Sequence, residues 1–141
     1  MIGRFPYKHL AKYPHMQPED VNVWDFFVET TPDFFETCDY DVTVGEGAKQ
    51  NPEHPENIQY DGKILTQKKI DVVGYNGDNV FLVEVKPVAN MRALGQILTY
   101  RRLWMLDHLT ELNVFSMIVC REMERELDAL FEDYGIIVKI V

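Results

Sequence analysis

The residues from 80 to 86, Val-Phe-Leu-Val-Glu-Val-Lys, constrain the fold more than any other part of the chain. Apolar side chains occupy both alternating sides of this run, which predicts a central β-strand that is covered on both faces. The two exceptions, Glu84 and Lys86, are two residues apart and therefore project from the same face. Because a buried carboxylate is costly unless a cation or hydrogen bonds hold it, Glu84 requires a partner.

The partner of Glu84 depends on how the strands on either side of the sequence Asn-Gly-Asp-Asn pair as a β-hairpin. If Gly77 and Asp78 are the central residues of a type II′ turn, then Asp71 faces Glu84. Directly opposed side chains lie roughly 5 Å apart at Cβ, where two carboxylates repel each other. A divalent metal ion between them would turn this repulsion into a binding site.

A second turn gives Glu84 a purely structural partner. If Asn76 and Gly77 form a type I′ turn, Lys69 faces Glu84 as a cross-strand ion pair and Asp71 is not opposed to it. The segment carries both turn signatures, so the local pattern leaves both registers open.

The other segments predict an α/β domain in the order αβββαβαβ, with a central mixed sheet flanked by helices. In chain order we expect an irregular arm over 1–17, a helix from Pro18 to about Glu29, a strand over Tyr40–Val44, a polar loop over 45–62, the hairpin over 68–86, a helix from the Asn90 cap to about Leu109, a strand over Val114–Val119, a charged helix from about Glu122 to Tyr134 and a closing strand over Ile136–Val141.

Composition favours one globular domain in a reducing, cytoplasmic setting. The 141 residues suffice for one core, and the 46% of hydrophobic residues excludes a disordered chain. No apolar run approaches the roughly 20 residues that a bilayer requires, and the N-terminus lacks a secretory pattern. Cys38 and Cys120 lie far apart, and the four histidines show no zinc-like spacing.

The net charge of the chain and the distribution of that charge favour opposite conclusions about a nucleic-acid partner. The net charge of −9 argues against one, because binding to phosphates requires cations. Residues 63–102, however, carry seven basic side chains and three acidic ones, a balance of +4 that leaves −13 on the rest of the chain. A basic middle in an acidic protein favours a surface that faces a polyanion, although a solvated charge pattern without function explains the same numbers.

Three motifs follow one another in the middle of the chain: Ile70-Asp71, then Glu84-Val85-Lys86 after the hairpin turn, then Gly95-Gln96-Ile97-Leu98-Thr99-Tyr100 on the next helix. This succession resembles the PD-(D/E)XK nucleases, a restriction-endonuclease-like superfamily that includes Holliday-junction resolvases and the nuclease domains of recombination helicases. The downstream Gln-x-x-x-Tyr resembles the RecB-like branch. The family core, αβββαβ, matches the order expected over roughly residues 18 to 120, and Ile70 replaces the Pro of the motif name.

The resemblance implies a single nuclease-like domain over 1–141 that hydrolyses DNA in one step with Mg²⁺ or Mn²⁺. Asp71, Glu84 and the carbonyl of Val85 would bind the metal, and Lys86 would act on the attacking water. Oxygen ligands suit these hard cations, which provide the activated water and charge stabilisation that phosphodiester hydrolysis needs. Endonuclease and exonuclease action both remain open.

Further candidate catalytic residues lie on the two helices before and after the hairpin. Gln96 and Tyr100 are four residues apart and share a helix face that could reach the site, although Tyr100 also fits a core stripe of Ala93, Ile97 and Trp104. Relatives usually place another acid on the first helix.

Four acids compete for that position on the first helix. Asp25 and Glu29 belong to the helix, but Glu19 and Asp20 are our candidates because the start of the helix can point at the active edge of the sheet. Favourable interaction with the helix dipole explains those two equally well.

DNA is the expected partner, without a membrane or an organic cofactor. Contacts to its phosphates are predicted for Lys68, Lys69, Arg92, Arg101 and Arg102, and a solvated helix face explains the arginines as well. Cutting two strands commonly uses two sites, which favours a homodimer.

The acidic net charge favours two alternatives to a nuclease. One is a catalytically inactive nuclease-fold module for protein or nucleic-acid binding and assembly. The other is an acidic protein that binds a basic partner by mimicking DNA.

Overall fold

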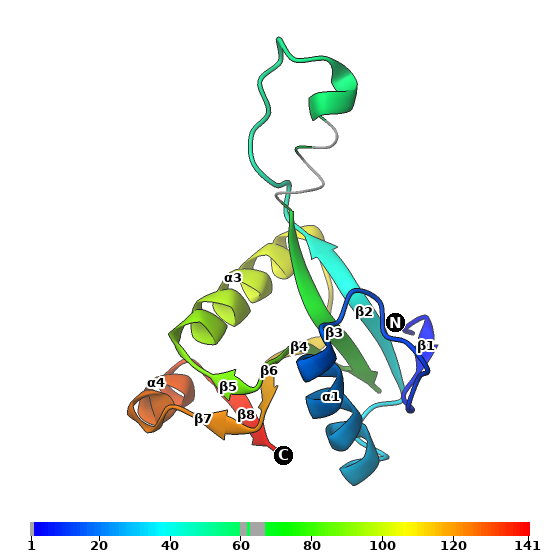
Figure 1. Ribbon diagram of the computed structural model, residues 1–141, viewed down its shortest axis with the longest axis vertical. Coiled ribbons are helices and arrows are strands. Elements are labelled where there is room, and N and C mark those ends of the chain that lie inside the picture. The colour runs from blue at the N-terminus through cyan, green and yellow to red at the C-terminus, as the bar shows by residue number, and fades with distance from the viewer. Residues whose placement is uncertain (1, 60–61, 63–66) are drawn as a thin grey trace.

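A six-stranded mixed sheet forms the centre of the computed structural model, which describes residues 2–59, 62 and 67–141 (Figure 1). The strand order is β1-β2-β3-β4-β6-β8, antiparallel from β1 to β4 and parallel from β4 to β8. The elements are β1 Phe5–Pro6, α1 Pro18–Thr30, β2 Thr37–Val44, β3 Lys68–Asn76, β4 Asn79–Val85, β5 Val88–Ala89, α3 Met91–Asp107, β6 Asn113–Cys120, β7 Glu122–Met123, the 3₁₀ helix η1 Arg125–Leu127, α4 Asp128–Asp133 and β8 Ile136–Ile140.

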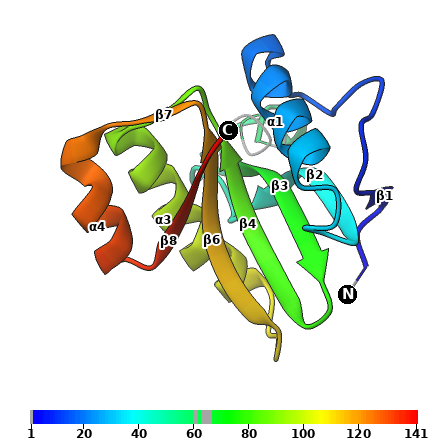
Figure 2. The same cartoon turned by 90° about the horizontal axis from the view of Figure 1, so that it is seen from below.

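Helices cover both faces of this sheet, with α1 on one side and α3 and α4 on the other (Figure 2). The strand β4 lies between them, as its apolar sequence predicts. Its Leu82 belongs to the cluster under α3, whereas Val83 and Val85 belong to the cluster under α1. Burial on both faces explains why this run tolerates so few polar residues.

Local sequence signals set the two helices that frame the site. Pro18 occupies the first turn of α1, whose Trp24 and Phe27 are fully buried. The helix α3 begins as expected, because the side chain of Asn90 accepts a hydrogen bond from the backbone N–H of Ala93. None of the helices in the described ranges combines the length and apolar character needed to cross a membrane.

The hairpin adopts the type II′ register, and the type I′ alternative is wrong. Val73 pairs with Leu82, and Asn76 pairs with Asn79. Gly77 has a φ of +57°, whereas Asp78 is not in the positive-φ region, as a type II′ turn requires. The carboxylate-bearing positions of β3 and β4 therefore face each other, one step beyond the Val72–Val83 pair.

In the paired strands β2 and β3, the alternation of side chains between the two faces of the sheet is reversed at the point where Asp41 lies opposite Asp71. Residues two apart on a regular strand point to the same face. Here Tyr40 packs in the cluster under α1, while Val42 packs against the cluster under α3. Asp41 has a φ of 53°, which is unusual for a residue other than glycine and accounts for the reversal. Asp71 therefore lies at the point where both faces of the sheet converge.

Two expectations outside the site need correction. The charged helix expected from Glu122 to Tyr134 is limited to α4, because the backbone N–H of Glu122 donates to Pro87 and that of Glu124 donates to Ala89, which holds this stretch extended. The arm over 1–17 is not entirely irregular, since β1 pairs with the start of β2. Within the expected loop over 45–62, residues 60 and 61 lie outside the described residues.

We predict that Gly77→Ala lowers the free energy of unfolding by about 1 kcal/mol, because a Cβ at positive φ is strained. A clash would not contribute, since a Cβ at this position meets nothing within 4 Å. Gly95→Ala is the matched control: its Cβ also meets open space, but its helical backbone should make the variant more stable by up to about 1 kcal/mol. Urea denaturation measures both, and equal effects would contradict the turn assignment.

Candidate functional site

Asp71 and Glu84 bring two carboxyl groups together inside the protein. The Asp71 Oδ2 accepts a hydrogen bond of 2.9 Å from the backbone N–H of Val85, which fixes its orientation toward β4. The two carboxyl groups also interact with each other, and each shifts the pKa of the other. Only 4% of Glu84 is exposed to solvent. The structure thus unites the two acids that the sequence singled out.

Burial governs the protonation of this pair. It raises the pKa of Glu84 to about 9, with a further contribution from the negative charge of Asp71. Burial also raises the pKa of Asp71, against the effect of the hydrogen bond from Val85. Burial and the charge of Asp71 therefore favour the protonated form of Glu84 when no cation is bound.

The second carboxylate oxygen of Glu84, Oε2, is buried and has no hydrogen-bond partner among the described residues. A buried polar atom without a partner is uncommon and carries a substantial free-energy cost. The described part of the protein therefore does not supply all the hydrogen bonds that the two carboxyl groups can form.

Lys86 places a positive charge beside the pair. Its Nζ lies 3.7 Å from Glu84 Oε1, and 20% of its side chain is exposed. The charge of Lys86 lowers the pKa of Asp71, Glu84 and Asp20, so it acts on all three acids. The backbone N–H of Lys86 donates to Val119 and anchors this residue at the end of β4.

Asp20 is the acid on α1 that faces the pair. Burial raises its pKa to about 6, followed by the charges of Asp71 and Glu19. Glu19 is exposed, and Asp25 is engaged by the hydroxyl of Tyr13. Within the described ranges no three His, Cys, Asp or Glu side chains form a group that could hold a metal ion. Asp20 therefore acts on the pair electrostatically in this arrangement.

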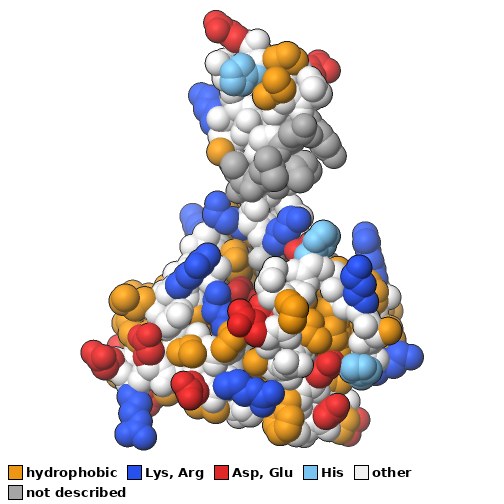
Figure 3. All heavy atoms as spheres, in the orientation of Figure 1, with side chains coloured by type: hydrophobic (Ala, Val, Ile, Leu, Met, Phe, Trp, Pro, Cys, Tyr) orange, Lys and Arg blue, Asp and Glu red, His pale blue; other side chains and the backbone are white. Residues whose placement is uncertain are grey.

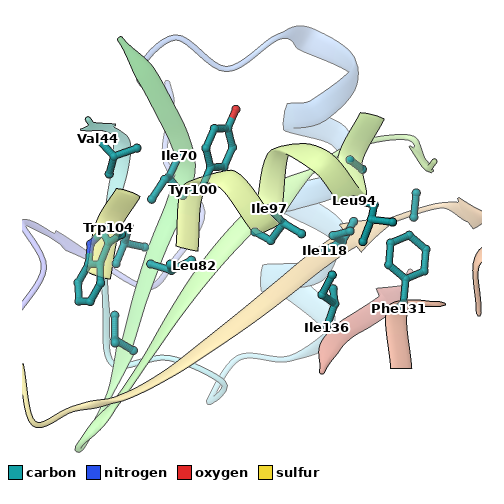
Figure 4. Close-up of a cluster of buried hydrophobic side chains, with 14 of the residues drawn as sticks. Val44, Ile70, Leu82, Leu94, Ile97, Tyr100, Trp104, Ile118, Phe131 and Ile136 are labelled. Atoms are coloured by element: carbon teal, nitrogen blue, oxygen red, sulfur yellow. The ribbon is translucent and has the colours of Figure 1, made fainter. Parts of the chain in front are cut away.

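Tyr100 belongs both to the core and to the rim of the site. It packs in one buried cluster with Ala93, Ile97 and Trp104, as the helix stripe predicts. Figure 4 shows its hydroxyl directed away from the neighbouring apolar side chains. Burial raises the pKa of Tyr100 to about 12, and the charges of Glu84 and Asp71 add to the effect. The amide Nε2 of Gln96 lies 3.5 Å from this hydroxyl.

A cleft of about 440 Å³ adjoins the site, and two of the five predicted phosphate-binding residues line it. The lining consists of Lys68, Arg92, Gly95, Gln96, Thr99 and Tyr100. In Figure 3, acidic side chains near the centre of one face have basic ones close by.

The other three predicted phosphate-binding residues do not line this cleft. Lys69 forms an ion pair of 3.6 Å with Asp41, and Arg101 donates to the carbonyl of Val114. Arg102 is exposed on α3.

Sequence reasoning missed Asp41. This residue lies across from Asp71, its charge raises the pKa of Asp71, and it contacts Lys69 and His15. The one available signal was its residue type, since Asp adopts positive φ more readily than most residues. Nothing in the local pattern of β2 indicated that the strand would use this conformation.

Comparison with known proteins identifies the fold. No protein-family model and no curated protein matches the sequence. Two solved structures resemble this chain in fold: a repair endonuclease from Pyrococcus abyssi, with a TM-score of 0.51 and 17% identity, and the EndoMS-dsDNA2 complex, with a TM-score of 0.51 and 13% identity. Each alignment covers 94% of this chain and 49% of the other, so the chain spans about half the length of these nucleases. The predicted fold class, a central mixed sheet flanked by helices, is confirmed.

The raised pKa of Glu84 predicts that stability falls as pH rises when a chelator is present. The ordinary pKa is 4.5 and the folded pKa is about 9, so the folded state holds a proton that the unfolded state has lost. The stabilisation is complete below pH 4.5 and is lost as pH rises toward 9. One such group contributes up to about 1.4 kcal/mol per pH unit, and Asp20 acts in the same direction.

Urea denaturation between pH 5 and 8 measures this dependence. Glu84→Gln should flatten it and should be more stable than the wild type at pH 8. The exposed Glu132→Gln serves as control and should keep the wild-type slope. A wild-type stability that increases over this range would contradict the assignment.

Proposed function

We propose that this chain is a PD-(D/E)XK-type DNA nuclease that uses Mg²⁺ or Mn²⁺ bound by Asp71 and Glu84. The observation that carries the proposal is that the partly buried carboxyl group of Asp71 lies opposite the buried carboxyl group of Glu84, whose Oε2 has no hydrogen-bond partner among the described residues. Such an arrangement is unfavourable for the protein by itself, because like charges oppose each other out of water. A divalent cation would relieve both costs.

The donor set fits a hard cation. Both side chains offer carboxylate oxygens, and Val85 offers a backbone carbonyl next to Glu84 in the sequence. Magnesium and manganese prefer such oxygen ligands and commonly retain several water molecules, so a site with few protein ligands suits them. Three clustered acidic side chains are not needed for this coordination.

When bound, the cation supplies an activated water near neutral pH and stabilises negative charge on the phosphoryl oxygens. The chain's own residues supply the remaining functions. The Nζ of Lys86, held 3.7 Å from Glu84, can donate hydrogen bonds to the attacking water or to the phosphate. Asp20, with a pKa of about 6, is ionised above that pH and can accept a hydrogen bond from a water molecule.

Tyr100 and Gln96 close one side of the site. With a pKa of about 12, the Tyr100 hydroxyl stays neutral at the pH of the reaction and can donate a hydrogen bond. Its contact with Gln96 and the burial of its ring fix its position. We assign these two residues to positioning rather than to proton transfer.

DNA as substrate is supported by two further observations. Lys68 and Arg92 line the cleft beside the carboxyl pair. Repair endonucleases share the fold, and one of the two structures is a complex with dsDNA. The acidic remainder of the chain would confine DNA to this basic region.

The proposal predicts DNA cleavage that requires Mg²⁺ or Mn²⁺ and stops with a chelator. Purified protein is incubated with linear, circular, single-stranded and branched DNA. Asp71→Asn, Glu84→Gln and Lys86→Ala should each reduce cleavage by about 100-fold or more. The control is Lys139→Ala, an exposed lysine on β8. Cleavage that persists in the chelator would refute the mechanism, and DNA binding without cleavage would favour an inactive module.

Metal binding can be measured separately by calorimetry with Mn²⁺. The wild type should bind the ion, and Asp71→Ala and Glu84→Ala should each abolish the heat of binding, because each removes one ligand. Unchanged binding in both variants would place the ion elsewhere.

Asp20 and Glu19 form a matched pair of neighbours on α1. Asp20→Asn should slow cleavage at least tenfold, because Asp20 faces the carboxyl pair, whereas Glu19→Gln should have little effect because Glu19 is exposed. Rates are compared at pH 7.5, above the pKa of Asp20. Equal effects would show that proximity to the pair is not what matters.

A further inference from the structure

Gly95 is a glycine that the fold itself does not require. It lies inside α3, it is exposed, and a Cβ at this position would meet nothing within 4 Å. Its φ is not positive, so no backbone strain calls for glycine. Glycine in a helix interior is less stable than alanine. Neither the backbone conformation nor the packing of the folded chain therefore accounts for a glycine at this position.

Gly95 forms part of the cleft beside the carboxyl pair. The residue follows Arg92 by one helical turn and precedes Gln96, and all three line the cleft. Tyr100 connects the cleft to the site, since it lines the cleft and the charges of Glu84 and Asp71 act on its hydroxyl. A molecule in the cleft would therefore lie next to the proposed catalytic centre.

The lining of the cleft suits an anion with polar groups. Lys68 and Arg92 contribute positive charge, and none of the six lining residues is acidic. The charge of Arg92 reaches the hydroxyl of Tyr100 and lowers its pKa, so it acts within the cleft. The amide of Gln96 uses its Nε2 toward Tyr100, while its Oε1 is buried without a partner in the described part of the chain.

We infer that a DNA strand crosses α3 at Gly95. The phosphodiester next to the one being cut would lie against the bare helix surface, between the positive charges of Lys68 and Arg92. Glycine serves here because it permits close approach of a ligand to the backbone. The inference rests on the proposed nuclease function and deepens it by assigning the path of the substrate.

Gly95→Ala and Gly95→Leu test this path, because both variants should fold better than the wild type. Each adds bulk to the cleft and replaces glycine by a stronger helix former. We expect unfolding midpoints in urea to rise while the KM for DNA cleavage increases, by about threefold for Ala and tenfold or more for Leu. Met105→Ala, at an exposed position on α3 outside the cleft lining, is the control and should keep the wild-type KM.

A second pair of variants tests the charge of the cleft. Arg92→Gln should raise the KM and reduce its dependence on salt, whereas Arg125→Gln, on the exposed η1, should not. Calorimetry with Mn²⁺ should give wild-type affinity for all these variants, which separates the cleft from the metal ligands.

The outcomes distinguish the two claims. A wild-type protein that cleaves no DNA refutes the proposed function and this inference with it. A wild type that cleaves DNA, together with a Gly95→Leu variant of unchanged KM, refutes only the path across α3. A Gly95→Ala variant less stable than the wild type would also overturn the inference, because it would show that the fold requires the glycine.

Discussion

The opposition of Asp71 and Glu84 across β3 and β4 is the interaction on which the rest of the site depends. Glu84 is buried and Asp71 is partly buried, burial raises the pKa of both, and Glu84 Oε2 lacks a hydrogen-bond partner among the described residues. Stable proteins seldom retain such a pair unless another group neutralises it. The surrounding positive charge of Lys86 offsets only part of the cost, since the pKa of Glu84 remains raised in its presence. This imbalance is the physical basis for assigning a cation to the site.

The arrangement of the two layers explains how separate elements reach one point. In a regular sheet, α1 and α3 would be separated by the sheet itself, on opposite faces. Because the side chains of β2 and β3 switch faces of the sheet at Asp41 and Asp71, the carboxyl pair interacts both with Asp20 from one layer and with Tyr100 from the other. The unusual backbone of Asp41 is therefore part of the construction of the site. Local strain of this kind is often retained where function depends on it.

The likeness to repair endonucleases and the chemistry of the site support each other without depending on each other. The comparison concerns the backbone over 94% of the chain at 13% to 17% identity, and it establishes the fold. Fold alone does not establish an activity. The carboxyl pair, the adjacent lysine and the basic cleft are observations on individual side chains of this chain. They are the basis on which we propose phosphodiester hydrolysis, because of what they can bind and stabilise.

The sequence by itself determined the features that depend on near neighbours. The apolar run of β4, the Asn90 cap of α3 and the shared face of Glu84 and Lys86 all follow from local periodicity and capping. Tertiary structure decided the features that depend on contacts between residues far apart in the sequence. Two turn types were compatible with the hairpin, and only the folded structure shows the register that opposes the two acids. Likewise, residues 122–124 are extended because they bond to the segment after β4, and Asp20 rather than Glu19 faces the site because of how α1 docks. These outcomes depend on the energies of contacts between residues that are far apart in the sequence. Local sequence patterns carry no information about those energies.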